Sequence, residues 1–333
     1  MRLGLDGFAV PGPALDPFQM LAWVRGQGLD GYFFGSLLHL TSDLDEGFLQ
    51  EVWREAERLG LYVELGIGNV NPHRFDRFPR VAELGGGDHR RGFERLVRVG
   101  AALGCRELRV DMGGEAARFD PSAPWSEQLG AARAFLSELA PLCRDLGCRL
   151  DVETHADATT FELVRLIEAV GPDVLGVCLD TANVLCRAED PIAAARRVAP
   201  YVRQTHVKDA ILYFDDDGLM RQSRPCGQGC IDWDDLLGLL AEHHSDLTLS
   251  IEDHKGLFRA FSYDPAWQAL HPELTAGELG ELVRLARDAE ARVARGEIDP
   301  PGSYEAAPWA EQALDRLQAS IRHLRGALER RSP

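Results

Sequence analysis

Four apolar segments in the second half of the chain end in side chains that could bind a metal ion or transfer a proton. They read Leu-Asp-Val-Glu-Thr-His, Val-Cys-Leu-Asp, Gln-Thr-His-Val-Lys-Asp and Leu-Ser-Ile-Glu-Asp-His-Lys, and they contain Glu153, Asp180, His206 and Glu252. Three carboxylates brought together would repel one another, and a divalent cation removes that repulsion. Three oxygen donors with one imidazole suit Mn²⁺, the ion we expect, and also Mg²⁺, Co²⁺ or Zn²⁺.

Further polar residues share the faces of these segments if the segments are strands. Side chains of a strand point alternately to its two faces, so His155 lies on the face of Glu153, and Lys208 on the face of His206. We expect His155 to contact a substrate or to orient the neighbouring glutamate. Lys208 is expected to bind a substrate carboxylate, phosphate or carbonyl, with an ion pair to a site acid as the alternative.

Strands and helices, which differ in the spacing of their apolar residues, must position these groups. Eight short segments rich in Val, Leu, Ile or aromatic residues are too short for typical helices and are expected to be strands. They are Arg2–Val10, Gly31–Ser36, Tyr62–Gly68, Glu107–Gly113, Arg149–Thr154, Gly176–Asp180, Arg203–Lys208 and Leu247–Asp253. Between them, apolar residues recur every three or four positions, which predicts helices with one buried face. These helices are expected at Asp16–Arg25, Asp45–Leu59, Phe93–Leu103, Gln128–Leu146, Thr160–Val170, Ile192–Val198 and Ile231–Glu242.

Alternation of strands and helices predicts parallel strand pairing, because each return to the same edge of a sheet needs a crossover. Eight such units match an α/β fold of the (β/α)8 TIM barrel type, in which reactive groups lie at the carboxyl ends of the strands. A doubly wound open sheet is the alternative. It is disfavoured because no G-x-G-x-x-G follows the first strand.

The pattern changes after Gly256, so we expect a barrel domain over residues 1–256 and a C-terminal helical extension over 257–333. Long helices are predicted at Leu274–Arg295 and Trp309–Glu329, with a break at Asp299-Pro-Pro-Gly-Ser between them. Apolar residues of the last helix step by three and four positions, which forms a narrow apolar seam. The seam is expected to pack on the barrel or at a subunit interface, which would make the protein a homo-oligomer.

Composition excludes several classes of protein. The formal net charge of the 333 residues is −17, which repels phosphate backbones and argues against nucleic acid as a partner. No apolar run approaches the ~20 residues that span a bilayer, and the N-terminus shows no secretory signal pattern. Seven cysteines, an odd number without regular spacing, indicate reduced thiols and a cytoplasmic location.

The chain also resembles the sugar phosphate isomerase/epimerase superfamily, the xylose-isomerase-like TIM barrels. The resemblance rests on Val-Glu-Thr-His at 152–155, Leu-Asp-Thr-Ala-Asn at 179–183, His-Val-Lys-Asp at 206–209, Pro-Cys-Gly-Gln-Gly-Cys-Ile-Asp-Trp at 225–233 and Ser-Ile-Glu at 250–252. It implies that Glu153, Asp180, His206 and Glu252 are the metal ligands and that Glu153 and Glu252 are also an acid/base pair. The implied activity is isomerisation or epimerisation of a small sugar, sugar acid or sugar phosphate through a metal-stabilised enediolate.

Two positions depart from the ketose 3-epimerases of that superfamily. Those enzymes carry a His where this chain has Asn183, and an Arg where it has Leu212. Arg224 is the basic residue expected to bind substrate, with Arg221, Lys255 and Arg259 as alternatives, because it precedes a Gly227-x-Gly229 loop and barrels often hold phosphate in loops after strands seven and eight.

Other functions remain alternatives at this point. A lyase (a decarboxylase, dehydratase or β-eliminating enzyme) acting on a keto-sugar would use the same metal site. A phosphodiesterase resembling the endonucleases that cut abasic DNA would need more His and Asp ligands than the motifs provide, and a barrel used only for binding would not need the intact ligand set.

Overall fold

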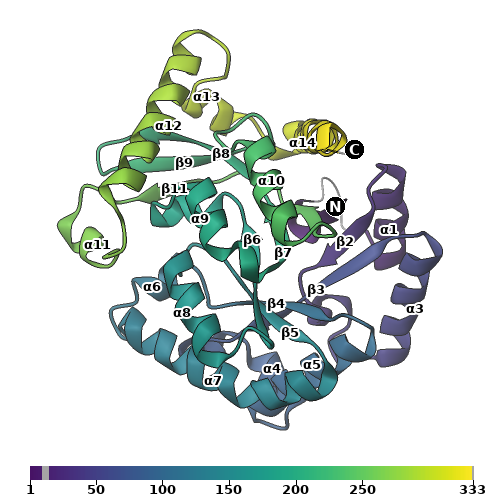
Figure 1. The fold of residues 1–333 in the computed structure, drawn as a ribbon. Coiled ribbons are helices and arrows are strands. Elements are labelled where there is room, and N and C mark those ends of the chain that lie inside the picture. Colours follow the sequence, from purple (N-terminus) through teal and green to yellow (C-terminus); the bar gives the residue numbers. More distant parts are fainter. Residues whose placement is uncertain (10–14, 332–333) are drawn as a thin grey trace.

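The computed structural model describes residues 1–9 and 15–331. Its centre is a closed barrel of eight parallel strands in the order β1-β10-β7-β6-β5-β4-β3-β2 (Figure 1). The strands are β1 (Arg2–Asp6), β2 (Gly31–Phe34), β3 (Tyr62–Asn69), β4 (Glu107–Asp111), β5 (Arg149–Glu153), β6 (Leu175–Asp180), β7 (Val202–Val207) and β10 (Thr248–Ile251). The expected TIM barrel is therefore confirmed. Val10, in the first expected strand, and residues 332–333 of the expected extension lie outside the described residues.

Helices surround the barrel, and Asp or Thr side chains begin most of the long ones. Asp16 and Thr159 each form a capping box with the residue three positions on, and Asp45 accepts a hydrogen bond from the Phe48 amide. The helices up to β10 are α1 (Pro17–Gly26), α2 (Leu37–Leu40), α3 (Glu46–Arg58), α4 (Pro79–Leu84), α5 (His89–Ala102), α6 (Glu115–Arg118), α7 (Trp125–Leu146), α8 (Thr160–Val170), α9 (Pro191–Val198) and α10 (Trp233–His243). Short 3₁₀ turns are η1 (Gly7–Ala9), η2 (Pro72–Arg77), η3 (Asn183–Arg187) and η4 (Ala199–Tyr201). Within residues 1–9 and 15–331, no helix has the length and apolar character to cross a bilayer.

A second, antiparallel sheet was not expected from the sequence. It has the order β11-β9-β8 and consists of β8 (Asp209–Phe214), β9 (Leu219–Arg224) and β11 (Leu257–Ala260). The sequence does contain an apolar run, Ile-Leu-Tyr-Phe, before an Asp-Gly turn, and this pattern is typical of a β-hairpin. Gly218 in that turn has φ 155°, and a Cβ there would lie 2.3 Å from the Ala260 carbonyl oxygen, so only glycine fits. Because β8 follows β7 directly and β11 follows β10, the sheet stands at the carboxyl ends of these barrel strands.

The C-terminal region begins with strand β11 and not with a helix. Its helices are α11 (Pro265–Ala269), α12 (Ala276–Ala294), α13 (Pro301–Ala306) and α14 (Trp309–Arg331). Helix α12 packs on β8 (Figure 1), and α14 packs against α10 and β1. In the apolar seam of α14, Leu317, Ile321 and Leu324 are buried, whereas Leu314 is half exposed. The boundary at residue 256 and a subunit contact through this region stay predictions.

We expect His271, which follows α11, to make folding stability depend on pH. The ring is buried, stacks on Trp267 with centroids 3.7 Å apart and lies with Nδ1 2.8 Å from the Trp267 carbonyl oxygen. Burial lowers the pKa of His271 to about 3. Between pH 6.5 and 3 the unfolded chain therefore binds a proton that the folded chain does not bind. The stabilisation is complete above about pH 6.5 and is lost as the pH falls, by about 2 kcal/mol at pH 5.

Urea unfolding of His271→Gln at pH 7 and at pH 5 measures this effect. The variant should lose less free energy of unfolding than the wild type between the two pH values. His243→Gln, which changes an exposed histidine of α10, is the control and should keep the wild-type dependence. Equal pH dependence of wild type and His271→Gln would contradict the prediction.

Candidate metal centre

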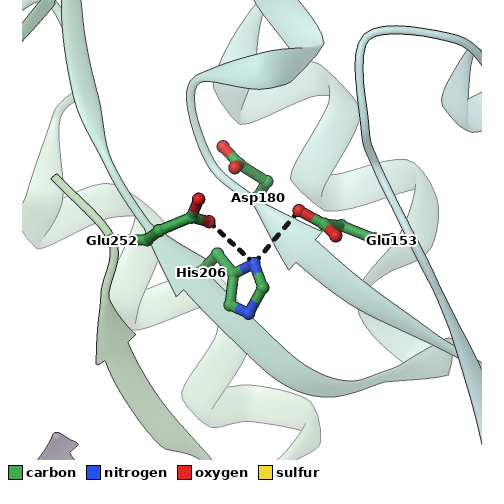
Figure 2. Close-up of side chains that lie close together, drawn as sticks. All are labelled: Glu153, Asp180, His206 and Glu252. Carbon is green, nitrogen blue, oxygen red and sulfur yellow. Dashed lines mark hydrogen bonds and ion pairs between the residues drawn. The ribbon is translucent and has the colours of Figure 1, made fainter. Parts of the chain in front are cut away.

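Four side chains from four neighbouring barrel strands converge at the carboxyl end of the barrel. Ligand atoms of Glu153, Asp180, His206 and Glu252 all lie within 4.8 Å of one another (Figure 2). Glu153 and Asp180 are the last residues of β5 and β6, His206 lies near the end of β7, and Glu252 directly follows β10. All four are buried. The structure thus brings together all the residues that the sequence predicted as metal ligands.

The imidazole of His206 lies between two carboxylates. Its Nδ1 is 3.0 Å from Glu153 Oε1 and 2.9 Å from Glu252 Oε2, and Figure 2 shows the two glutamates on either side of the ring. Burial acts to lower the pKa of His206, but the Cys178 thiol and the two carboxylates raise it well above its ordinary value. One ring nitrogen carries at most one hydrogen. It can therefore donate to only one of the two oxygens, and Glu252 Oε2 is left buried without a hydrogen bond.

Lys208, which we expected to bind substrate, lies among the same carboxylates. Its Nζ is 2.8 Å from Asp180 Oδ2 and 3.0 Å from Glu252 Oε1. Burial acts to lower the pKa of Lys208, but the Asp180 and Glu252 carboxylates raise it above its ordinary value, so the ammonium stays charged. Asn183, one of the two departures, donates from Nδ2 to Asp180 Oδ2 over 2.8 Å and from its backbone amide to Oδ1. Asp180 is thus held in place before any ion binds.

Arg109 is a site residue that the sequence analysis missed. Its Nε lies 3.4 Å from Glu153 Oε2, and its guanidinium donates to Asp111 over 3.1 Å. Burial acts to raise the pKa of Glu153, but His206 and Arg109 hold it well below its usual range. Strand alternation could have identified Arg109. It is two residues before Asp111, so the two side chains lie on the same face of β4.

His155 lies beside the cluster, and its backbone amide donates to the Glu153 carbonyl oxygen over 2.9 Å. Its ring sits against Gly114, where a Cβ would lie 3.2 Å from the imidazole, and its buried Nδ1 has no hydrogen-bond partner. Burial acts to lower the pKa of His155, but the carboxylates of Glu153 and Asp157 contribute to raising it above its ordinary value. The substrate-binding role expected for His155 stays a prediction.

The loop with Gly227 and Gly229 is organised by the protein itself. Asp209, next to Lys208, accepts hydrogen bonds from the amides of Gly227, Gly229 and Ile231 and from Trp233 Nε1. Burial raises the pKa of Asp209 to about 6, with these donors acting in the opposite direction. The amides that could have bound a phosphate are therefore already occupied by a carboxylate.

The structure does not bring Arg224 to the cluster. Its guanidinium lies over the Tyr304 ring at 3.6 Å and donates to Gln222 and to the Asp299 carbonyl oxygen. These contacts face the C-terminal region. The predicted substrate-binding role of Arg224 has no support from its contacts.

The donor set fits a divalent cation. Three carboxylates are clustered around one imidazole nitrogen, and one carboxylate oxygen, Glu252 Oε2, is buried without a hydrogen bond. A buried carboxylate oxygen without a hydrogen bond is costly, and a cation would satisfy it together with the other donors.

We expect Asp6, which the sequence analysis also missed, to orient His206 for metal binding. His206 Nε2 and Asp6 Oδ2 are 3.6 Å apart, and both atoms are buried without a hydrogen bond. The Phe33 ring packs edge-on against the imidazole at 4.7 Å. Burial, together with the charge of Glu252, raises the pKa of Asp6 to about 7. Histidine ligands usually donate their second ring N–H to such a carboxylate, and losing this partner lowers metal affinity by roughly 10–100-fold.

Isothermal titration with Mn²⁺ checks this expectation. Asp6→Ala should weaken binding by roughly 10–100-fold. Asp6→Asn should recover most of the affinity, because its amide oxygen can still accept from Nε2. Wild-type affinity in Asp6→Ala would show that the pair has no orienting role.

The chain is similar in sequence to proteins that are already known. A model of the xylose isomerase-like TIM barrel matches residues 21–270. The uncharacterized protein YihM of Escherichia coli (strain K12) is 34% identical over 86 residues, which are 26% of this chain and 26% of YihM. The 3-oxo-isoapionate decarboxylase of Pectobacterium atrosepticum is 21% identical over 206 residues, 61% of this chain and 66% of the decarboxylase.

A solved structure adds a comparison at the level of the fold. The crystal structure of D-psicose 3-epimerase in the presence of D-fructose superimposes with a TM-score of 0.59 at 18% identity. The match covers 88% of this chain and 98% of that one. At this identity the likeness concerns the fold alone.

Proposed function

Because the chain belongs to the xylose isomerase-like TIM barrel family, we propose that it is a divalent-metal-dependent enzyme acting on a small sugar, sugar acid or sugar phosphate. Its reaction would be an isomerisation or epimerisation by proton transfer at carbon next to a carbonyl. The observation that carries this proposal is the convergence of Glu153, Asp180, His206 and Glu252 within 4.8 Å at the carboxyl end of the barrel.

These four residues would hold the ion, with Mn²⁺ as our first choice and Mg²⁺, Co²⁺ or Zn²⁺ as alternatives. When bound, a divalent cation supplies positive charge that stabilises an enediolate form of the substrate. The protein supplies the other positive charges nearby through Lys208 and Arg109, both of which are buried.

Glu153 and Glu252 would be the acid/base pair. Neighbouring cationic groups keep the pKa of both carboxyls below their usual range, so both are ionised at neutral pH and ready to accept a proton. They lie on either side of His206 (Figure 2), so one can remove a proton from a substrate carbon and the other can return one elsewhere. Lys208 would orient the oxygen atoms of the substrate, and His155, with its free Nδ1, would contact a hydroxyl group.

A lyase is the second candidate, and one observation favours it. The relative that matches the larger part of this chain, 61%, is called a decarboxylase. Loss of CO₂ from a β-keto acid leaves its electron pair in an enolate, which is then protonated at carbon, so the same charge-stabilising residues would serve.

One set of experiments separates the two candidates. Elemental analysis of the purified protein should find about one divalent ion per chain. Incubation with ketoses and keto-acids in D₂O should then show deuterium entering the substrate for an epimerase, and CO₂ or a conjugated double bond for a lyase. A protein without bound metal, and without either reaction on added Mn²⁺, would refute the proposed function.

The cellular setting is also a proposal. All seven cysteines carry free thiols, which suits the reducing cytoplasm that we propose. The net charge of −17 suits a small-molecule substrate better than nucleic acid. We further propose that the C-terminal region provides the contact of a homo-oligomer.

A further inference from the structure

We propose that Arg221 binds a carboxylate of the substrate, so that the substrate of the metal site is a sugar acid and not a neutral sugar. This inference rests on the proposed function, because it names the substrate class of the same site. Arg221 lies in β9, the middle strand of the small sheet at the mouth of the barrel.

Arg221 is a buried cation that lacks an anionic partner. Only 3% of the residue is exposed. Its guanidinium donates to Ser223 Oγ over 3.0 Å and lies 3.9 Å from Cys186 Sγ, a weak acceptor, while Nε has no partner. Among the residues that the structure describes, no carboxylate oxygen lies within 4.0 Å of this guanidinium. Burying an unpaired charge is costly, and an anionic ligand would remove the cost.

Other buried arginines of the described chain show what is missing at Arg221. All except Arg224 lie within 4.0 Å of a carboxylate. The pairs are Arg74–Asp120, Arg109–Asp111, Arg118–Glu162, Arg187–Glu115 and Arg316–Asp253. Arg224 is satisfied in another way, by a carbonyl oxygen, an amide oxygen and the Tyr304 ring. Arg221 has none of these.

Arg221 faces the proposed metal centre. Side chains alternate along β9, and Gln222 and Arg224 point to the C-terminal region, where they contact residues 299–305. Arg221 points the other way, to Cys186 in η3, the turn that follows Asp180. Its positive charge is among the groups that act on Lys208 and on His254, which flank Glu252. A ligand bound at the cluster would reach Arg221 on the side of Lys208, along η3.

The ligand group is a carboxylate and not a phosphate. A guanidinium can bind either group with two parallel hydrogen bonds. Phosphate sites in barrels add backbone amides from the loops after strands seven and eight. Here the amides of Gly227, Gly229 and Ile231 already donate to Asp209. One guanidinium with the Ser223 hydroxyl nearby suits the smaller, singly charged carboxylate.

Three probes with one carbon skeleton test the proposal. D-fructose is neutral, 2-keto-D-gluconate carries a carboxylate in place of its first hydroxymethyl group, and D-fructose 6-phosphate carries a phosphate at the other end. Tartrate and threitol serve as a second acid and alcohol pair. Binding to the Mn²⁺-loaded protein is measured by isothermal titration for wild type, Arg221→Gln, Arg221→Lys and Arg224→Gln. Arg54→Gln, at an exposed position of α3, controls for the loss of one positive charge.

We expect the wild type to bind at least one acid more tightly than its alcohol by about tenfold or more. Arg221→Gln should abolish this preference without weakening the binding of alcohols, and Arg221→Lys should keep part of it. Arg54→Gln should behave like the wild type. Circular dichroism and the melting temperature verify that each variant is folded.

Four results would overturn the proposal. They are an absence of saturable acid binding, equal binding of acids and alcohols, tighter binding of the phosphate than of the acid, and loss of the preference in Arg224→Gln but not in Arg221→Gln. Failure of the proposed function gives a different result, in which the protein binds no Mn²⁺. Because Arg221 is not a metal ligand, an acid should then still raise the melting temperature of the wild type but not that of Arg221→Gln.

Discussion

Replacing Glu153 with glutamine should slow solvent deuterium exchange at the reacting carbon of the substrate by roughly 10²–10⁴-fold. The amide has nearly the shape of the carboxylate and keeps an oxygen that can accept from His206, 3.0 Å away. It cannot accept a proton from carbon. The loss should appear in kcat, because the group acts in the transition state and not in ground-state binding.

Glu153 is also a proposed ligand, so metal content must be measured in the same samples. Exchange rates are compared at saturating Mn²⁺, after elemental analysis has shown equal loading of variant and wild type. Glu107→Gln is the matched control, because Glu107 is the first residue of β4 at the opposite end of the barrel. Unchanged exchange in fully loaded Glu153→Gln would remove Glu153 from the role of base. Glu252→Gln, made in parallel, identifies which carboxylate acts on which substrate carbon.

Asparagine in place of Asp180 should lower the affinity for Mn²⁺ by more than about 100-fold, beyond the 10–100-fold loss expected for an orienting partner such as Asp6. Both oxygens of Asp180 accept hydrogen bonds, Oδ1 from the Ala182 and Asn183 amides and Oδ2 from the Asn183 side chain. An asparagine at this position places its NH₂ group against either the two backbone N–H donors or the Asn183 side-chain donor. The variant therefore loses a ligand oxygen and gains an unfavourable contact between donors.

Thermal unfolding gives a second measurement of the same loss. An ion present at 100 times its Kd should stabilise the wild type by about 2.7 kcal/mol, and Asp180→Asn should lose this stabilisation at the same Mn²⁺ concentration. Asp151→Asn is the matched control, because Asp151 is a buried aspartate of β5 with no hydrogen bond to either carboxylate oxygen. Burial raises the pKa of Asp151 well above its ordinary value. Equal Mn²⁺ responses of Asp180→Asn and the wild type would contradict the assignment of Asp180 as a ligand.

Lys208 and Arg109 provide positive charge beside the clustered carboxylates. The Lys208 ammonium contacts the carboxylates of Asp180 and Glu252, and Arg109 contacts Glu153. Each carboxylate of the cluster therefore has a cationic neighbour from its own chain, which reduces their mutual repulsion. A bound ion would therefore compete with Lys208 for the same carboxylate oxygen atoms.

The sequence by itself determined the barrel and the set of converging ligands. Strand and helix periods differ, so eight apolar segments separated by amphipathic helices could be recognised without coordinates. Parallel strands in a barrel bring their carboxyl ends to one face, which placed Glu153, Asp180, His206 and Glu252 together by topology alone. These inferences depend only on local periodicity and on the order of elements along the chain.

Tertiary structure alone decided which other polar residues belong to the site. Arg221 and Arg224 lie on opposite faces of β9 by strand alternation, but only the tertiary structure decides that one face meets η3 and the other the C-terminal region. Asp6 reaches His206, 200 residues further along the chain, only because β1 and β10 pair and close the barrel. The direction of a side chain at the mouth depends on the register between strands that are distant in sequence. That register is determined by packing of the whole barrel, and no local pattern encodes it.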